Sequence, residues 1–432
     1  MRSACGTLDG IRPQPHRATP CTRSGFGFPI LWRRSIPLAH RKPDLNIRTA
    51  LLLTVFTAPL AAAELRLADP AYLATIRDDE ATLPRGFAPE ERVRWRLPDL
   101  SQMPLAPPGG SVDTPAEYER NAGLLIRWGS QNALLTEMAV AMTNNEPDMI
   151  LYVVVSSALQ ASATTTLANA GANLSRVQFI VGPSDSVWMR DYGPRYIAEN
   201  GRRSMVDHVY NRPRPLDDAV PGLVAQQTGE TKFDIPLTHG GGNFHLFADG
   251  SAYMTRLIVN ENPGLSEQQI RDYYMVYQGL DVTLTDPLPA SFDSTQHIDM
   301  WMLPADGDRV IVNEYPNTGG VYSVPRQVTE ATATLLANRG KTVLRLPGWR
   351  ASNSHYTYAN AVILNNTVLM CNFNGYTAEN ANALAIFQQA FPARTIVPVN
   401  CSTIISLAGA IHCIVMHMPE VLTDVLLRTG FE

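Results

Sequence analysis

Short apolar runs alternate with stretches of helical pattern along most of this 432-residue chain, and this alternation is the feature that most restricts its fold. Apolar runs at 124–128 and 149–155 are each followed by a helical pattern, at 132–142 and 158–171. A further apolar run covers 176–182. Strands that alternate with helices are typical of α/β proteins. The sequence therefore predicts an α/β fold.

The same pattern continues to the C-terminal end of the chain. Residues 266–279 predict a helix that begins with a capping box formed by Ser266 and Gln269 and ends at Gly279. Further helices are predicted at 328–340 and 378–391, a hairpin around Asn365 and Asn366, and strands at 395–399 and 410–418. No composition shift or long linker divides residues 118–432, so these residues are predicted to form one domain.

The first 63 residues have the layout of a secretory signal. Arg48 precedes an apolar run from Ala50 to Leu60, and Ala61 to Ala63 offer a small-residue cleavage site. A membrane anchor is the alternative, but the run is shorter than the roughly 20 residues that span a bilayer. We expect cleavage after Ala63 and a secreted or periplasmic protein without a stable membrane anchor. The Pro-rich residues 64–117 are expected to form an irregular lead-in to the domain.

Composition and cysteine count narrow the class of protein. Hydrophobic residues make up 45% of the chain, charged residues 17%, and the net charge is −5, which favours a compact protein and disfavours a surface for nucleic acid. Removal of the leader leaves Cys371, Cys401 and Cys413, an odd number, so at least one thiol stays free or pairs between molecules. Cys371 and Cys401 lie in apolar, strand-like runs, where buried thiols and a disulfide both remain open.

Four short polar segments follow predicted strands. They are "DSVWMRDYGP" with Asp191, "THGGGNFH" with Gly240 to Asn243, "STQHIDMW" with His297 and Asp299, and "GAIHC" with Cys413. Each has an ordinary interpretation alone: a surface ion pair, a turn, a buried histidine on a strand, a core thiol. On a strand, the H-x-D spacing would place His297 and Asp299 on one face. Together, two Asp, one His and one Cys form a chemical set.

That set suits a guanidinium substrate. A guanidinium is planar, cationic and presents its N–H donors in a fixed fork, which two carboxylates can hold. A thiolate can then attack the central carbon, and a histidine can protonate the nitrogen that departs as ammonia. Two nearby carboxylates would raise the pKa of the thiol, and a bound cation would offset that effect. The sequence thus indicates hydrolysis of a guanidino group through a covalent cysteine intermediate.

In chain order, "WMRDYGP", "GGGN", "HID" and "GAIHC" resemble the signatures of the guanidine-modifying enzymes of the pentein fold. Within that group, the chain resembles the bacterial agmatine deiminases and the secreted Porphyromonas-type peptidyl-arginine deiminases, over residues 85–430. The resemblance implies a five-bladed, pseudo-symmetric α/β propeller with the site in its central channel. It implies neither a cofactor nor a metal ion.

The resemblance also implies roles for individual residues. Asp191 and Asp299 would bind the guanidinium, His297 would be the general acid and base, and Cys413 the nucleophile. His412, beside Cys413, is not expected to be the base. The substrate would further contact Trp188, Asn360 in "YTYANAVIL", and Gly242 and Asn243 of the Gly-rich loop.

Arg212 and Arg214 in "YNRPRPLDDAVP" favour the peptidyl-arginine branch. They resemble the segment with which those enzymes hold a substrate's terminal carboxylate, a group that agmatine lacks. Taken alone, the two would be solvated loop residues. Two departures from the family pattern are Ser294, where a tyrosine is usual, and Ala408, where a glycine is usual.

We therefore predict deimination of peptidyl-arginine, with a preference for a C-terminal position, to citrulline and ammonia. Peptides or proteins that carry arginine are the predicted partners. The alternatives are an agmatine deiminase or other small-guanidine hydrolase, and an exported binding protein on the same scaffold without catalysis. A papain-like hydrolase is disfavoured because its Cys precedes its His along the chain. The sequence leaves the oligomeric state open.

Overall fold

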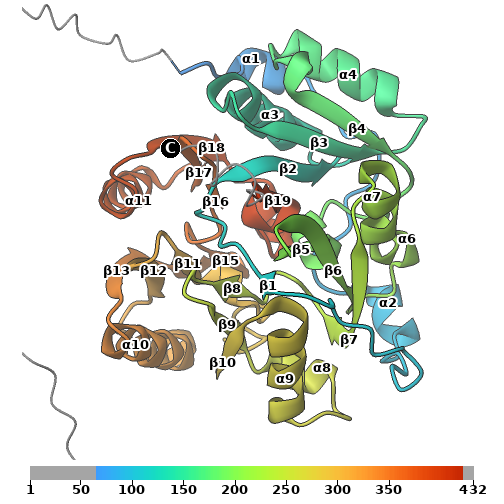
Figure 1. Cartoon of the computed structure of the whole chain (residues 1–432). Helices are drawn as coiled ribbons and strands as arrows, with labels where there is room; N and C mark the ends of the chain where they lie inside the picture. The colour runs from blue at the N-terminus through green and yellow to red at the C-terminus, as the bar shows by residue number, and fades with distance from the viewer. Residues whose placement is uncertain (1–64, 422–432) are drawn as a thin grey trace, which may run out of the picture. The chain divides into compact units, whose positions relative to one another are not determined.

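The computed structural model describes residues 65–421 (Figure 1). The predicted leader and its cleavage after Ala63 lie outside these residues, so they stay predictions. Within residues 65–421, no helix combines the length and the apolar character that crossing a bilayer requires.

Five sheets of three or four strands share one internal order: an antiparallel strand, then two parallel strands connected through helix. The five runs are β19–β2–β3, β5–β6–β7, β8–β9–β10, β11–β12–β13 and β16–β17–β18. The first sheet also contains β4 and the second β1, and β14 with β15 forms a separate hairpin. The predicted α/β class is confirmed.

The strands have the following bounds: β1 Val112–Asp113, β2 Asn121–Arg127, β3 Ile150–Val155, β4 Val177–Val181, β5 Arg195–Glu199, β6 Arg202–Tyr210, β7 Lys232–His239, β8 His245–Leu246, β9 Ser251–Thr255, β10 Asp281–Thr285, β11 Met302–Pro304, β12 Arg309–Glu314, β13 Thr342–Pro347, β14 Trp349–Ala351, β15 Ser354–Tyr356, β16 Val362–Ile363, β17 Thr367–Asn372, β18 Thr395–Asn400 and β19 Met416–Pro419. The predicted hairpin around Asn365 and Asn366 is confirmed, because β16 and β17 pair antiparallel.

Helices connect the parallel strands of each sheet. Their bounds are α1 Pro70–Leu73, α2 Pro89–Arg94, α3 Asn132–Asn145, α4 Gln160–Asn169, α5 Met189–Tyr192, α6 Pro215–Asp218, α7 Val220–Thr228, α8 Leu257–Glu261, α9 Glu267–Gln278, α10 Ser323–Asn338 and α11 Thr377–Ala390. Short 3₁₀ turns are η1 Leu174–Arg176, η2 Ile298–Met300, η3 Gly320–Tyr322, η4 Ile404–Leu407 and η5 His412–Ile414. Helix α9 has the predicted capping box of Ser266 and Gln269, and Gly279 ends it at a φ of 70°.

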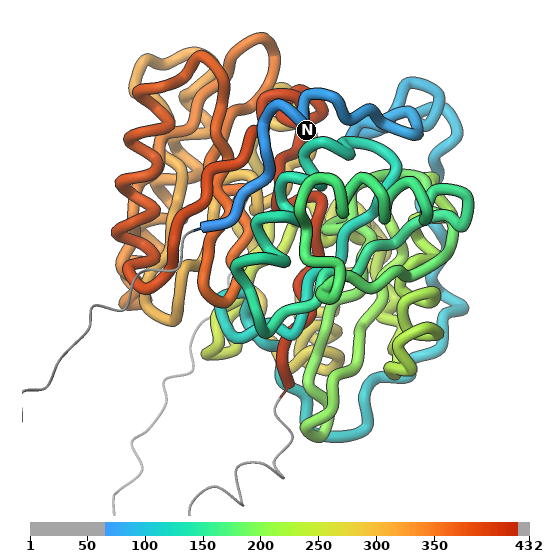
Figure 2. The backbone as a smooth tube through the Cα atoms, turned by 90° about the horizontal axis from the view of Figure 1, so that it is seen from above, coloured from blue at the N-terminus to red at the C-terminus, as the bar shows by residue number. Residues whose placement is uncertain are grey.

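The last strand completes the first sheet. β19 pairs antiparallel with β2, so Met416 lies opposite Leu125, although nearly the whole domain separates them in sequence. In Figures 1 and 2 this red C-terminal strand lies beside the blue-green strand of the first sheet. The two ends of the domain therefore hold each other in place, and Cys413 enters from the turn just before β19.

Two predicted strands differ from the structure at functionally important places. The segment with His297 and Asp299 is not a strand: His297 precedes the 3₁₀ turn η2, which contains Asp299. Likewise, Cys413 lies in η5 rather than in a strand over 410–418, and the strand β19 begins only at Met416. The buried polar side chains of the two segments contact one another. In a tight turn, neighbouring residues can point to the same place, whereas on a strand they point to opposite faces.

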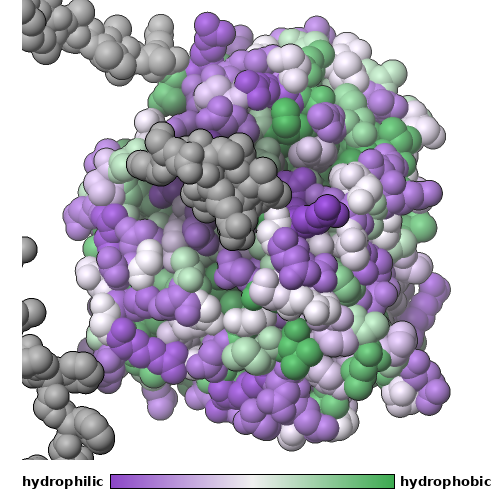
Figure 3. Space-filling model, viewed as in Figure 1, coloured by the Kyte–Doolittle hydropathy of each residue, from purple (hydrophilic) through white to green (hydrophobic). Residues whose placement is uncertain are grey.

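Cys371 and Cys401 form a disulfide that joins the ends of β17 and β18, with a Cα–Cα distance of 5.3 Å. Of the two possibilities that the sequence left open, buried thiols or a disulfide, the structure has the disulfide. Cys413 is the free and buried cysteine among the described residues. On the face drawn in Figure 3, hydrophobic residues are interspersed with hydrophilic ones.

Candidate active site

Asp191 is buried at the end of the segment that follows β4. It lies in the short helix α5, and its backbone carbonyl accepts a hydrogen bond from Gly241 N at 2.9 Å. Its side chain contacts the Gly-rich loop as well, since Gly242 N donates to Oδ1 at 3.3 Å. The first two of the four predicted segments therefore lie against each other.

His297 and Asp299 come to the same place from the loop between β10 and β11. His297 Nδ1 lies 3.4 Å from Asp191 Oδ1, and Asp299 N donates to the carbonyl of Gly242 at 3.2 Å. Both side chains are fully buried. His297 Nε2 has no hydrogen-bond partner within residues 65–421.

Cys413 completes the group and is held by Asn360. The Asn360 side-chain oxygen accepts hydrogen bonds from His412 N at 3.0 Å, Cys413 N at 3.3 Å and Cys413 Sγ at 3.2 Å. Its amide nitrogen donates to the carbonyl of Asp299 at 3.2 Å. Asn360 thus joins the nucleophile to one of the two carboxylates, and Cys413 Sγ lies 3.6 Å from Asp299 Oδ2.

The Gly-rich loop leaves space at the centre of the group. A Cβ atom on Gly242 would lie 2.8 Å from Asp191 Oδ1 and 2.9 Å from Asp299 Oδ2, so any side chain there would fill the gap between the two carboxylates. Asn243 has a different part: its amide pairs with the backbone of Thr255 at 2.8 and 3.2 Å and fixes the loop to β9.

A guanidinium already lies between the carboxylates, and it belongs to the chain itself. Arg85 donates from Nε and Nη2 to the two oxygens of Asp191, both at 2.9 Å, and from Nη2 to Asp299 at 3.2 Å. The same Nη2 is 2.7 Å from His297 Nδ1. Because arginine only donates hydrogen bonds, His297 Nδ1 is the acceptor in this contact. The Arg85 side chain is completely buried.

These contacts set the protonation of the site. Burial would raise the pKa of Asp191 and Asp299, but the Arg85 guanidinium holds the pKa of both below the usual range for aspartate. For Cys413, burial raises the pKa well above that of a free thiol, Arg85 lowers it in part, and Asp299 and Asp191 raise it again. The site therefore combines two carboxylates with a neutral thiol, as expected from the sequence.

Trp188, Arg212 and Arg214, which were predicted to contact substrate, all bond main-chain oxygens of residues 83–86. Trp188 Nε1 donates to the carbonyl of Leu83 at 2.9 Å, and Arg212 Nε donates to the carbonyl of Arg85 at 3.3 Å. Arg214 Nη2 donates to the carbonyls on either side, Pro84 at 2.8 Å and Gly86 at 3.0 Å. An arginine guanidinium can donate to peptide carbonyl oxygens as well as to a carboxylate.

His412 supports Asp299 from behind. Its Nδ1 is 3.0 Å from Asp299 Oδ2 and its Nε2 is 2.9 Å from Glu117 Oε2, and Arg190 pairs with the other oxygen of Glu117 at 2.5 Å. Burial would raise the pKa of Glu117, but Arg190 and His412 hold it well below its usual range. This chain of hydrogen bonds fixes the orientation of the Asp299 carboxylate.

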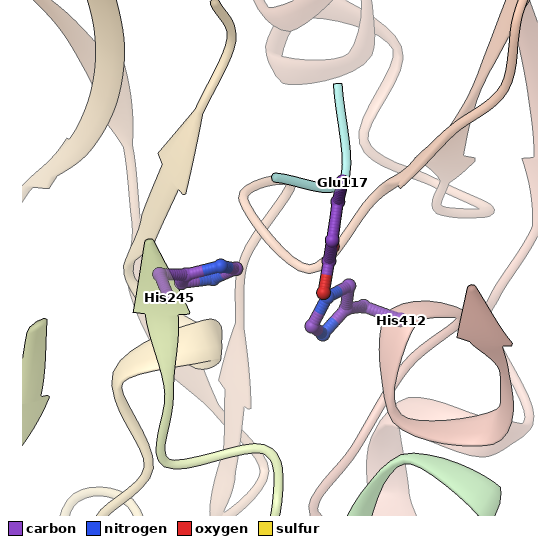
Figure 4. A group of neighbouring side chains, drawn as sticks. All are labelled: Glu117, His245 and His412. Carbon is purple, nitrogen blue, oxygen red and sulfur yellow. The ribbon is translucent and has the colours of Figure 1, made fainter. Parts of the chain in front are cut away.

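Glu117 and His412 also lie near His245 (Figure 4), and one ligand atom from each falls within 4.8 Å of the others. The contacts do not favour a cation here. The Arg190 guanidinium already neutralises Glu117, and both ring nitrogens of His412 are in hydrogen bonds. The group is better described as the support of Asp299.

Two residues at this site were missed by sequence reasoning. Glu117 lies in "TPAEYE", where an acidic residue in a Pro-rich run has no distinguishing context. Arg85 lies in "TLPRGFAPE", inside the predicted lead-in, and nothing in its neighbours marks it as a ligand. Only the folded chain brings these segments to the carboxylates.

Comparison with known proteins matches this fold to one class. The agmatine deiminase of Enterococcus faecalis has the same fold, with a TM-score of 0.64 and 18% identity, and the match covers 74% of this chain and 99% of that one. A candidate arginine deiminase of Porphyromonas gingivalis also gives a TM-score of 0.64, at 19% identity, covering 72% and 99% of the two chains. The α/β fold is thus that of the agmatine and arginine deiminases of pentein type.

At the level of sequence, residues 113–419 match the model of the Porphyromonas-type peptidyl-arginine deiminases. A candidate agmatine deiminase of Marinomonas sp. (strain MWYL1) is 26% identical over 290 residues, which are 57% of this chain and 77% of the relative. The chain belongs to the Porphyromonas-type peptidyl-arginine deiminase family, a family of hydrolases that act on guanidino groups.

Proposed function

We propose that this protein hydrolyses the guanidino group of arginine in peptides or proteins, giving citrulline and ammonia. The supporting observation is Arg85. An arginine within a peptide segment fits its guanidinium between Asp191 and Asp299, against His297, while its flanking carbonyls bond Trp188, Arg212 and Arg214. A peptide substrate can accept these hydrogen bonds through its main-chain oxygens, whereas agmatine has no main-chain oxygen to accept them.

The reaction follows from the positions of these groups. Cys413 transfers its thiol proton to His297, and its Sγ attacks the guanidinium carbon. The bond from that carbon to the terminal nitrogen facing His297 then breaks. His297 supplies the proton with which that nitrogen leaves as ammonia, and a thiouronium remains on Cys413. His297 then takes a proton from water, the resulting hydroxide adds to the carbon, and the C–S bond breaks to release the ureido product. The two carboxylates hold the cationic carbon in place throughout.

A C-terminal arginine is the preferred substrate in this proposal. Its carboxylate would begin where the carbonyl oxygen of Arg85 now lies, which accepts from Arg212 Nε at 3.3 Å. A charged oxygen there would form a stronger hydrogen bond than a neutral carbonyl does.

Agmatine deimination is the second candidate, because relatives from Marinomonas and other bacteria are named for it. Ammonia release should be measured from agmatine, free arginine, and peptides with a terminal or an internal arginine, using wild type, Arg85→Ala and Cys413→Ser. We expect turnover of the peptides, fastest with terminal arginine, and none in Cys413→Ser. Turnover of agmatine alone would contradict the peptide proposal, and undiminished citrulline formation by Cys413→Ser would exclude the nucleophile.

Two broader features belong to the same proposal. The five sheets, each with the same strand order and with β19 completing the first, would be the blades of a five-bladed propeller around the site. The protein would be exported, and the disulfide of Cys371 with Cys401 supports this, since such bonds persist in oxidising compartments.

A further inference from the structure

Residues 83–91 run through the site as a bound peptide would. Trp188 bonds the carbonyl of Leu83, Arg212 that of Arg85, and the carbonyl of Leu407 accepts from Arg85 N at 3.1 Å. The segment is therefore held at main-chain atoms on both sides of the arginine. These are contacts to its backbone, so they would hold a peptide of another sequence in the same way.

The far end of the segment is fixed by a charge pair. Glu91 accepts from Arg214 at 2.8 and 3.0 Å, and the Arg214 side chain is almost completely buried. Phe87 lies under the Arg212 guanidinium, 4.4 Å from its carbon to the ring centroid. Both arginines that the sequence assigned to substrate are thus engaged by the chain itself.

The space around the Arg85 guanidinium is too small for a second guanidinium. A Cβ atom added to Gly242 would come within 2.0 Å of Arg85 Nη2, and one added to Gly409 would lie 3.1 Å from both Arg85 Cδ and Cys413 Sγ. Arg85 thus fills the narrow space between the Gly-rich loop and the nucleophile. A second guanidinium has no room while Arg85 is bound.

We propose that residues 83–91 are an internal ligand of this site, with Arg85 bound where an external guanidinium binds, so that the two compete. The inference rests on the proposed function only in taking the Asp191 and Asp299 pair as the guanidinium site. The segment is tethered, so its effective concentration at the site is high and fixed. The apparent dissociation constant of an external ligand is then the intrinsic value divided by the small fraction of molecules whose site is open.

The charges of Asp191 and Asp299 favour competition between Arg85 and an external guanidinium over a purely structural role for Arg85. Two buried carboxylates within reach of one guanidinium need a cation, because a buried charge without a partner is strongly destabilising. An incoming guanidinium supplies the same cation, with the same fork of donors. Exchange of one for the other therefore leaves the carboxylates paired, whereas a lysine or a neutral ligand would not replace all of the hydrogen bonds.

The test measures binding without catalysis, in a Cys413→Ser background. Two probes are titrated by calorimetry: agmatine, and an acetylated and amidated peptide with the sequence of residues 83–87. Arg85→Ala should bind at least one of them ten-fold or more tightly than the variant that keeps Arg85. Arg94→Ala is the matched control, because Arg94 is exposed at the end of α2, just after the segment, and it should change nothing. Unchanged affinity for both probes in Arg85→Ala would overturn the proposal.

A second measurement separates an effect on binding from a folding defect. The melting temperature of Arg85→Ala should fall and then rise with added probe, while the protein with Arg85 should respond little to the same concentration. Should Arg85→Ala not fold, Arg85→Gln keeps the aliphatic stem and should give the same result. An equal response of both proteins would overturn the proposal. Tight probe binding without ammonia release in Arg85→Ala carrying Cys413 would instead contradict the proposed function and leave the internal ligand standing.

Discussion

Asn360 is the residue that sets the position of the nucleophile. Its side-chain oxygen accepts from Cys413 Sγ at 3.2 Å and its nitrogen donates to the carbonyl of Asp299 at 3.2 Å. Asn360→Ala should lower kcat about 100-fold and change KM little, because displacement of a reacting atom by roughly 1 Å has an effect of that size. Steady-state kinetics alongside thermal melting will separate this from unfolding, and a change in KM alone would contradict it.

Removal of Arg85 should reverse the pH dependence of stability at the carboxylates. With Arg85 present, the pKa of Asp191 and Asp299 lies below the ordinary 3.8, so their stabilisation is present above that value and is lost as the pH falls through the depressed pKa values. In Arg85→Ala, burial and mutual repulsion should raise the pKa of at least one carboxyl. Its stabilisation is then present below the unfolded value and is lost as the pH rises.

The difference in unfolding free energy between wild type and Arg85→Ala should therefore grow from about pH 4 to about pH 7. Urea denaturation at a series of pH values will measure it. A difference that stays constant over this range would contradict the assignment of Arg85 as the counter-ion of both carboxylates.

At the scale of elements, the turn before Cys413 carries a strained residue. Ala408 has a φ of 67° and a ψ of 35°, in the left-handed region that favours glycine, and the family pattern has glycine there. Ala408→Gly should raise the unfolding free energy by about 1 kcal/mol. Ala410→Gly, at a position without positive φ, is the control and should lower it. Chemical denaturation will measure both unfolding free energies. A decrease in the unfolding free energy of Ala408→Gly would contradict backbone strain at Ala408.

The elements also mark the limit of sequence reasoning. Amphipathic periodicity and caps predicted α9 and the β16–β17 hairpin, because these depend on neighbours in sequence. The same reasoning placed His297 and Asp299 on a strand, and the structure has a 3₁₀ turn there. Short polar turns take their shape from distant partners, here Gly242 and Asn360, which periodicity does not report.

At the scale of the whole molecule, the disulfide should add stability without taking part in the chemistry. Cys371 and Cys401 are separated by 30 residues, and closing a loop of that size stabilises a fold by about 3 kcal/mol. The double variant Cys371→Ala/Cys401→Ala should lose about that much and keep its kcat, because Cys413 is untouched. Guanidinium chloride is a ligand candidate here, so urea is the better denaturant. Unchanged stability of the double variant would contradict the stabilising role of the disulfide. Loss of activity in folded protein would contradict its separation from the chemistry.

The role of Arg85 could not be predicted from the sequence, because it depends on the folded arrangement of the whole molecule. The four segments with Asp191, Gly242, His297 and Cys413 were recognisable as an ordered set, and the fold brings them together. Arg85 comes from an irregular segment, and its site exists only once those loops have met. A ligand supplied by the chain's own N-terminal part leaves no periodic or spaced signal in the sequence.

The covalent intermediate on Cys413 gives the most direct test of the central claim. Arg85→Ala should be mixed with a peptide ending in arginine, quenched rapidly in acid, digested and analysed by mass spectrometry. We expect the peptide that contains Cys413 to carry the mass of the substrate less ammonia, and the signal to vanish in Arg85→Ala/Cys413→Ser. Unmodified Cys413 at every quench time while citrulline accumulates would contradict nucleophilic catalysis by this residue.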